Sequence, residues 1–266
     1  MMEMKKMNLI VFSLMALLVF SASKPKKNKK EDRFKEVSHR FYAGTYEVTN
    51  KEFREYLEYL KATDRLAEYN SSYPDTTQWM KKFPHSFNGP FVEKYFWHPG
   101  FNNYPVVNVS LEAAKAYCAW LSDSYNSKEK RKYKKVTFRL ATEQEWNKMA
   151  AVLPGHNLPW YGNFAYEPGS SCSNTNIKFE NKVSGDNKYD YSSDGGMTTC
   201  VVGSYKANKM GVYDIIGNVA ELTESGIIKG GSWDNTIDEC VVNKSQDFQL
   251  PDPRVGFRVV MLIDEL

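Results

Sequence analysis

The chain has 266 residues, of which 14% are aromatic, and this is enough apolar material for a substantial core, which excludes a globally disordered chain. Its formal net charge is +3, but residues 1–30 hold seven lysines against one glutamate, so residues 31–266 carry 28 basic and 31 acidic side chains. A mildly acidic globular part is not typical of a nucleic-acid-binding protein, and no nucleic acid is expected as a partner.

The N-terminal residues have the pattern of a secretory signal peptide. Lys5 and Lys6 precede an apolar run at 9–20, and small residues suited to cleavage follow. We therefore expect residues 1–23 to be removed on export, residues 24–39 to form a basic linker, and the mature protein to lie in the periplasm or at the outer-membrane periphery. The alternative is an uncleaved anchor, although the run is shorter than the roughly 20 apolar residues of a membrane span. Contact with a membrane is expected only through that segment or through a partner.

Residues 42–62 are predicted to pass from a strand into a helix. Tyr46 and Val48 alternate as on a half-buried strand. Thr49 or Asn50 can cap the helix that follows, because the side-chain oxygen of either residue can accept a hydrogen bond from a free backbone N–H.

Residues 64–104 form an aromatic insert whose prolines exclude long elements. An ordered insert of this length usually binds something or packs over the core. Interfaces are enriched in aromatic side chains, so five of them are candidates for partner contact, with burial in the core as the alternative for each. These are Trp79, Phe83, Tyr95, Phe96 and Trp97.

Two later segments each pair a strand with a capped helix. In residues 105–125, three valines predict a strand and Ser110 is the expected N-cap. In residues 136–153, Thr142 is the expected N-cap and Glu145 completes a capping box.

The rest of the chain is predicted to form turns and then short strands. Residues 154–200 are rich in Gly, Asn, Ser and Asp, and such oxygen-rich turns either bind calcium or simply form turns. Two helical segments near the front and short strands behind them give an α+β fold. The short strands are predicted within 201–205, 211–223, 227–233 and 255–262.

Four cysteines, at 118, 172, 200 and 240, are too few for a disulfide scaffold in a chain of this length. Cys118 lies on an apolar helical face and is expected to be buried and inert. Cys172 and Cys200 flank the turn-rich segment and are the expected disulfide pair in an oxidising compartment.

Six stretches of the chain follow one another in a characteristic order: YEVTNKEF, YPVVNVSLEAAKAYCAWLS, FRLATEQEWNKMA, GVYDIIGNVAELT, KGGSW and VGFRVV. In these stretches and their order the chain resembles, over residues 40–262, the formylglycine-generating enzyme (sulfatase-modifying factor) family. The resemblance implies one domain, residues 40–264, with a C-type-lectin-like fold of irregular α+β type. The insert is also similar to that of the gliding-motility and type IX secretion ring lipoproteins of Bacteroidetes, although this chain lacks their lipid-acceptor cysteine.

The same resemblance locates a candidate catalytic site. Oxidases of the family place two cysteines five residues apart after the GGS-aromatic turn, where they hold copper and engage the substrate thiol. Here the first position falls on Asn235 and the second on Cys240. Soft thiolates select Cu(I), and one thiolate with an amide cannot reproduce that pair, so copper is not expected. Cys240 is interpreted as a relic, or as a structural or disulfide cysteine; it is catalytic only if oxidase activity is retained.

Calcium is the cofactor that the resemblance leaves open. The GNVAELT stretch corresponds to a turn that supplies oxygens to calcium in the enzymes, so Asn218 and Glu221 are candidate ligands. Asn176 and Asp194 lie in a stretch that resembles a second calcium site. The alternative for Asn218 is a turn amide that bonds its own backbone.

These observations favour a non-catalytic exported scaffold or binding module of the cell envelope, similar to a type IX secretion or gliding-motility ring component, with envelope protein partners that can form a ring. Two alternatives stay open. The first is an oxidase that converts a protein cysteine to formylglycine, and the second is a lectin-like protein that binds carbohydrate or peptide.

Overall fold

The computed structural model describes residues 33–154, 156–160, 173–180 and 189–266. All of them belong to one unit of the chain, residues 32–266. The predicted signal peptide lies outside the described residues. Within the described ranges, no helix is long and apolar enough to cross a membrane.

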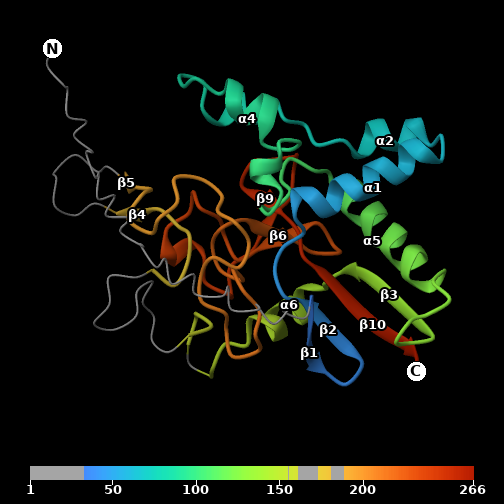
Figure 1. The fold of residues 1–266 in the computed structure, drawn as a ribbon. Coiled ribbons are helices and arrows are strands. Elements are labelled where there is room, and N and C mark those ends of the chain that lie inside the picture. The colour runs from blue at the N-terminus through green and yellow to red at the C-terminus, as the bar shows by residue number, and fades with distance from the viewer. Residues whose placement is uncertain (1–32, 155, 161–172, 181–188) are drawn as a thin grey trace, which may run out of the picture. The chain divides into compact units, whose positions relative to one another are not determined.

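A four-stranded antiparallel sheet has the order β1-β2-β10-β3 (Figure 1). Its strands are β1 (Phe34–Ser38), β2 (Phe41–Gly44), β3 (Lys135–Leu140) and β10 (Val259–Glu265). The predicted linker 24–39 is therefore wrong at its C-terminal end. Residues 34–38 pair with β2, so the domain includes them and does not begin at residue 40.

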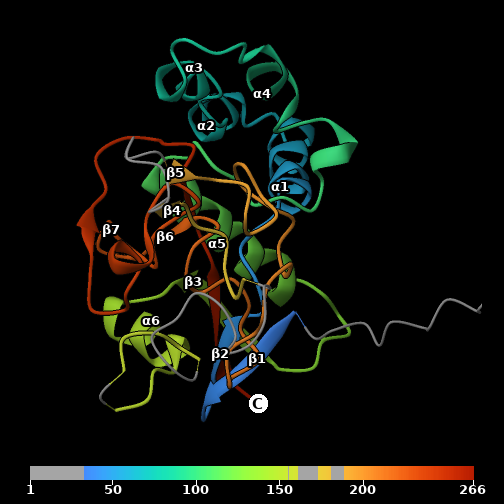
Figure 2. The same cartoon turned by 90° about the vertical axis from the view of Figure 1, so that its left-hand side faces the viewer.

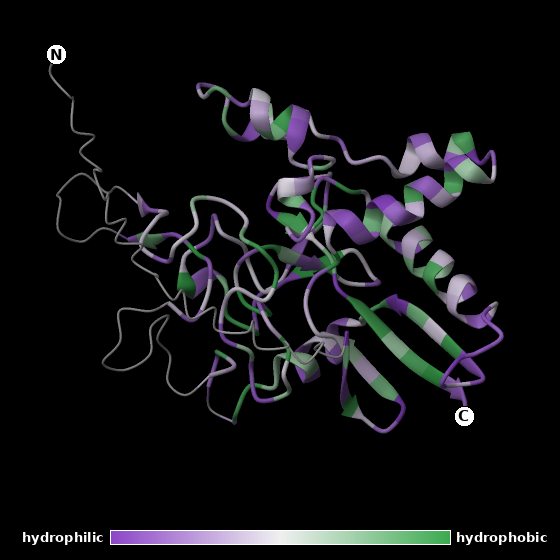
Figure 3. Ribbon diagram, in the orientation of Figure 1, coloured by the Kyte–Doolittle hydropathy of each residue, from purple (hydrophilic) through white to green (hydrophobic). Residues whose placement is uncertain are grey.

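Helices cover both faces of this sheet because its central strands alternate between two apolar faces. Phe138 and Met261 pack with α1 (Asn50–Ala62) and α5 (Leu111–Asn126) in one core cluster. Ala43 and Val260 face the second cluster, which includes α6 (Glu143–Ala150). Most of β10 is accordingly hydrophobic in Figure 3.

The three predicted helix caps are confirmed. The Oγ1 of Thr49 accepts a hydrogen bond from the N–H of Glu52 at 3.2 Å, and the Oγ of Ser110 accepts one from the N–H of Ala113 at 3.1 Å. At α6, Thr142 and Glu145 form the expected capping box. Each cap satisfies a backbone donor that the helix itself leaves free, which is why these helix starts can be read from the sequence.

Three strand predictions differ from the structure. The strand expected at Tyr46 and Val48 lies earlier, as β2, and the strands expected at 106–109 and 201–205 are not formed. Val106 donates one backbone hydrogen bond to the carbonyl of Val48 at 2.8 Å, but Asn108 has a φ of +63°, which breaks the extended backbone before a ladder can form. Residues 201–205 form a turn, with Gly203 at a φ of +77°. The valines at 106, 107 and 109 are nevertheless buried. Their apolar pattern therefore predicted burial correctly but predicted a strand wrongly.

The last part of the chain forms a second four-stranded sheet, of order β8-β7-β6-β9, in which β6 and β9 are parallel. Its strands are β6 (Ala220–Leu222), β7 (Ile227–Lys229), β8 (Gln246–Asp247) and β9 (Val255–Gly256). A two-stranded ribbon joins β4 (Phe179–Glu180) to β5 (Tyr189–Asp190), and a short 3₁₀ turn spans Ile237–Glu239. The expected α+β class is confirmed.

The aromatic insert is helical rather than irregular. It forms α2 (Leu66–Ser72), α3 (Gln78–Lys82), α4 (Gly89–Lys94) and a 3₁₀ turn at Pro99–Phe101. Figure 2 shows α2, α3 and α4 gathered at one end of the described fold, beside α1. The prolines limit each helix to about two turns or fewer, as proline's missing N–H requires.

Candidate functional site

The turn that corresponds to the family's cysteine site follows directly after β7. Its conformation requires glycine, because Gly230 and Gly231 have φ values of +86° and +68°. Asn235, which stands at the first cysteine position, folds back onto this turn. Its Oδ1 accepts hydrogen bonds from the N–H of Ser232 at 3.1 Å and from the Ser232 hydroxyl at 2.8 Å. Asn235 therefore has a structural role in the turn.

Cys240 is sealed beneath the same turn. Its side chain has no exposed surface, and a Cβ added to Gly231 would lie 2.3 Å from its Sγ. It packs in the second core cluster with Trp146 and Ile215. Burial raises the pKa of the Cys240 thiol well above its usual range. A buried neutral thiol is a poor nucleophile and a poor metal ligand, because both roles require the thiolate.

Asp234, which sequence reasoning missed, links this turn to the insert. Its carboxylate is bonded by Lys82 of α3, by the hydroxyl of Tyr191 at 2.9 Å and by Arg254 at 3.3 Å. Lys178 lies 3.9 Å from it. Burying a carboxylate to 6% exposure costs free energy unless such partners bond it. The turn is thus held in place by cations from three separate segments.

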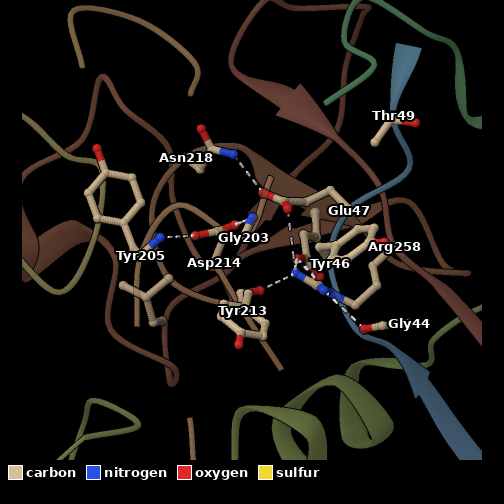
Figure 4. Close-up of polar contacts among 12 residues, drawn as sticks. Gly44, Tyr46, Glu47, Thr49, Gly203, Tyr205, Tyr213, Asp214, Asn218 and Arg258 are labelled. Carbon is tan, nitrogen blue, oxygen red and sulfur yellow. Dashed lines mark hydrogen bonds and ion pairs between the residues drawn. The ribbon is translucent and has the colours of Figure 1, made fainter. Parts of the chain in front are cut away.

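Beside the second sheet lies a buried group of three carboxylates around one arginine, formed by Glu47, Asp214, Glu221 and Arg258. Arg258 bonds Glu221 through Nε at 2.9 Å and Nη2 at 2.5 Å, and it donates to the carbonyls of Gly44 and Tyr213. Figure 4 shows Glu47 between Asn218 and Arg258. Asn218 donates to its Oε1 at 2.9 Å, while its Oε2 lies 4.0 Å from Arg258 and has no hydrogen-bond partner within the described ranges.

Charge balance in this group sets its protonation. One guanidinium cannot neutralise three carboxylates, and Arg258 is committed to Glu221. Burial, together with the charge of Asp214, raises the pKa of Glu47 well above its usual range. Burial likewise raises the pKa of Asp214 to about 6, although the N–H groups of Gly203 and Tyr205 oppose this shift.

The predicted calcium pair of Asn218 and Glu221 is not brought together as a ligand set. Glu221 is already paired with a cation, because one of its oxygens accepts two hydrogen bonds from Arg258, and its other oxygen accepts one from the Trp146 indole N–H at 2.8 Å. The Asn218 Oδ1 accepts from the N–H of Cys200 at 2.8 Å. Glu221 is therefore corrected from a metal ligand to the partner of Arg258, and in the described part of the chain no group of three or more His, Cys, Asp and Glu side chains could hold a metal ion.

Asn176 and Asp194 do lie close to each other. One oxygen of Asp194 accepts a hydrogen bond from the N–H of Ile177, the neighbour of Asn176, at 2.6 Å, and the other accepts one from the N–H of Gly196 at 2.9 Å, but no cationic side chain pairs with this carboxylate among the described residues. The buried Oδ1 of Asn176 has no hydrogen-bond partner within the described residues, and burial raises the pKa of Asp194 to about 6. A hard cation such as calcium would satisfy both groups. It would bind the free amide oxygen, and its charge would offset the cost of burying the charged carboxylate.

The predicted disulfide stays a prediction. Cys200 is half-buried, and its Sγ lies 3.5 Å from the Tyr205 hydroxyl. Cys172 lies outside the described residues. Cys118 is buried, and burial raises the pKa of its thiol, as expected for an inert core cysteine.

Three of the five predicted partner-contact residues are core residues. Trp79, Tyr95 and Phe96 are almost completely buried, which corrects that prediction. Trp79 stacks on Phe91 at 4.7 Å and lies 6.4 Å from Trp233, so it fixes the insert to the glycine turn. Phe83 is half-buried against Trp233 as well. Trp97 remains 53% exposed, and Phe87, which the sequence did not single out, is 89% exposed.

The fold and the glycine turn agree with the family that the chain matches. Residues 20–263 match the sulfatase-modifying factor enzyme 1-like domain, and the chain belongs to that family. It is 29% identical over 229 residues to the inactive C-alpha-formylglycine-generating enzyme 2 of Bos taurus, which covers 74% of this chain and 67% of that protein. It is 25% identical over 202 residues to the formylglycine-generating enzyme of Mus musculus, with 69% of this chain and 48% of that protein covered. The chain thus spans about half to two thirds of the length of these relatives.

Solved structures show the same fold. PvdO from Pseudomonas aeruginosa aligns with a TM-score of 0.55 and 21% sequence identity, covering 84% of this chain and 80% of that chain. At such low identity the likeness supports the fold alone.

Proposed function

We propose that this chain is a non-catalytic member of its family that acts as an exported scaffold or binding module. The observation that carries the proposal is the geometry of the cysteine site. Asn235 is tied into the turn and Cys240 lies beneath it with no exposed surface. No thiolate pair can form there, and Cu(I) is held in proteins by such soft ligands. The similarity to a relative that is itself named inactive supports the same proposal.

Measurements of copper binding and of oxidase turnover test this proposal directly. We expect the purified protein to bind no stoichiometric Cu(I) and to convert no cysteine-containing peptide to formylglycine, as measured by metal analysis and mass spectrometry. Cys240→Ala should behave like the wild type in both assays, because the thiol takes no part in chemistry. Copper-dependent turnover that Cys240→Ala abolishes would instead establish the oxidase alternative.

A more specific proposal concerns location and partners. The signal-like N-terminus and the similarity of the insert to those of ring lipoproteins support an envelope partner, in a ring of the type IX secretion or gliding-motility kind, in the periplasm or at the outer-membrane periphery. With Trp79, Tyr95 and Phe96 buried, the insert can offer Trp97 and Phe87 to such a partner. Exposed aromatic side chains of this kind often carry much of the affinity at interfaces.

The exposed aromatics of the insert give a second prediction. Trp97→Ala and Phe87→Ala should leave the thermal midpoint almost unchanged, since both side chains are exposed, and should reduce crosslinking to an envelope partner. Met197→Ala is the matched control, because Met197 is an exposed apolar residue outside the insert. The proposed contact would be refuted if Met197→Ala and the insert variants retained the partner equally.

Calcium is the cofactor that we propose, held by Asn176 and Asp194 rather than by Glu221. These residues supply one free amide oxygen and one carboxylate, and backbone carbonyls or water would complete the set of about six to eight oxygen ligands. Its role would be structural, because it would join the segment at 173–180 to the turn at 194–196.

A further inference from the structure

A groove of about 750 Å³ lies between the glycine turn and the loop that carries β8. Its floor contains Gly230, Gly231, Ala220 and Val255. Gly230 is buried and Gly231 is partly buried, and neither position could carry a side chain, because the space for a Cβ is already filled. At Gly231 the Cβ would be 2.3 Å from the Cys240 Sγ, and at Gly230 it would be 2.7 Å from the carbonyl of Ile215. A ligand can therefore approach the floor closely and meets no reactive group.

The rim of the groove is rich in unused amides. Asn243, Gln246 and Gln249 line it, all three are exposed, and no side-chain amide of the three makes a hydrogen bond within the described residues. The partly buried ring of Phe248 lies on the same loop and also lines the groove. Side-chain amides both donate and accept hydrogen bonds, and they do so without bringing charge.

Charge in the groove is nearly balanced. Arg254 is paired with Asp252 at 2.7 Å, so these two charges cancel. The remaining charged side chains of the lining are the acidic Glu239 and Asp247 and the basic Lys244. A strongly anionic or cationic ligand would find no matching excess of charge there. The lining instead suits a neutral ligand with many groups that donate and accept hydrogen bonds.

We propose that this groove binds an uncharged oligosaccharide. Sugar hydroxyls both donate and accept hydrogen bonds, which matches the amides of Asn243, Gln246 and Gln249. The carboxylates of Glu239 and Asp247 can accept further hydrogen bonds from hydroxyls. An aromatic ring such as that of Phe248 can pack against the apolar face of a sugar ring. The volume lies within the range of about 300–1,000 Å³ that is typical of small-ligand sites. The inference rests on the proposed non-catalytic function, for which it names a ligand class.

An extended peptide fits the groove less well. Peptides often bind by adding a strand to an exposed sheet edge, and β8 is the edge strand here. However, β8 has only two residues, Gln246 and Asp247. A peptide would therefore find too short an edge for a continuous ladder of backbone hydrogen bonds.

The test is to screen the full chain on an array of neutral and acidic oligosaccharides and to measure the best tetrasaccharide by calorimetry. We expect neutral glycans to bind, and the Gln246→Ala/Gln249→Ala variant to weaken binding at least tenfold. Asn70→Ala, which removes an exposed amide on α2, is the matched control and should bind as the wild type does.

Three results would overturn the glycan site: no binding of any neutral glycan, preference for acidic glycans, or unchanged binding in the double variant. A peptide that binds the groove when no glycan does would also overturn it. The underlying function is judged separately. A chain that binds no glycan and has no oxidase turnover loses only the glycan proposal, whereas copper-dependent turnover removes the non-catalytic proposal itself.

Discussion

Replacing Arg258 by methionine is expected to cost about 3–5 kcal/mol of unfolding free energy, the range observed when one partner of a buried ion pair is removed. Arg258 is 1% exposed and bonds Glu221 through two nitrogens. Its loss would leave Glu221 charged without a cation and would free the carbonyls of Gly44 and Tyr213. Urea unfolding at pH 7, followed by tryptophan fluorescence, measures the effect.

Two comparisons make this prediction specific. Arg65→Met removes the exposed ion pair of Arg65 with Glu68 and should change stability very little, because water and salt screen such pairs. Arg258→Met combined with Glu221→Gln should recover part of the loss, since the second change removes the uncompensated charge. If Arg258→Met proved no more destabilising than Arg65→Met, the buried ion pair would not contribute the stability that its contacts indicate.

The local signals in the sequence explain why much of the fold was predictable. Thr49, Ser110 and Thr142 each precede an apolar helical face. Capping depends on residues only three positions apart, so the start of each helix can be predicted from a short stretch of sequence. The strand β3 could be predicted because Val136, Phe138 and Leu140 alternate with polar residues, and β10 because residues 259–263 form the unbroken apolar run that is typical of a strand buried on both faces. The valines at 106, 107 and 109 show the limit of this reasoning, since burial on all sides produces an apolar run without a ladder.

The candidate site was less predictable because its contacts are distant in sequence. Glu47 lies 171 positions from Asn218, and Glu221 lies 37 positions from Arg258. A signal was present, since Glu47 and Arg258 are charged residues within apolar stretches, and such residues are rarely buried without partners. The partner-contact prediction for the aromatic insert was partly wrong for a different reason. Composition cannot tell a ring that stacks inward, as Trp79 does, from one that faces outward, as Trp97 does.

The same buried carboxylates predict an unusual dependence of stability on pH. An acid whose pKa is higher in the folded than in the unfolded state makes the folded protein bind more protons, so stability rises as the pH falls through that interval. Burial raises the pKa of Asp214 to about 6, from an ordinary value of 3.8, and it also raises the pKa of Glu47 well above its usual range. Each such group contributes a slope of about 1.4 kcal/mol per pH unit while it is protonated only in the folded state.

We therefore expect the calcium-free protein to be more stable at pH 5 than at pH 7, by about 1 kcal/mol from Asp214 alone, and Glu47 should add to this rise. Below about pH 4.5 the trend should reverse. Hydrogen bonds from Arg139 and the Thr142 cap lower the pKa of Glu145. Burial would raise the pKa of Asp252, but hydrogen bonds from Arg254 outweigh it and lower this pKa as well. The stability that both carboxylates contribute is lost as they become protonated. Urea unfolding from pH 4 to pH 8 in the presence of EDTA measures the curve.

Glu47→Gln separates this explanation from a general acid effect. Glutamine has the shape of a neutral glutamic acid, so the variant should be at least as stable as the wild type at pH 7 and should show a shallower rise toward pH 5. Added calcium should flatten the curve further if it binds Asp194, because a bound cation favours the charged carboxylate and lowers its pKa. A wild-type protein whose stability falls steadily from pH 7 to pH 5 would show that Glu47 is ionised in the folded state and that Arg258 compensates it.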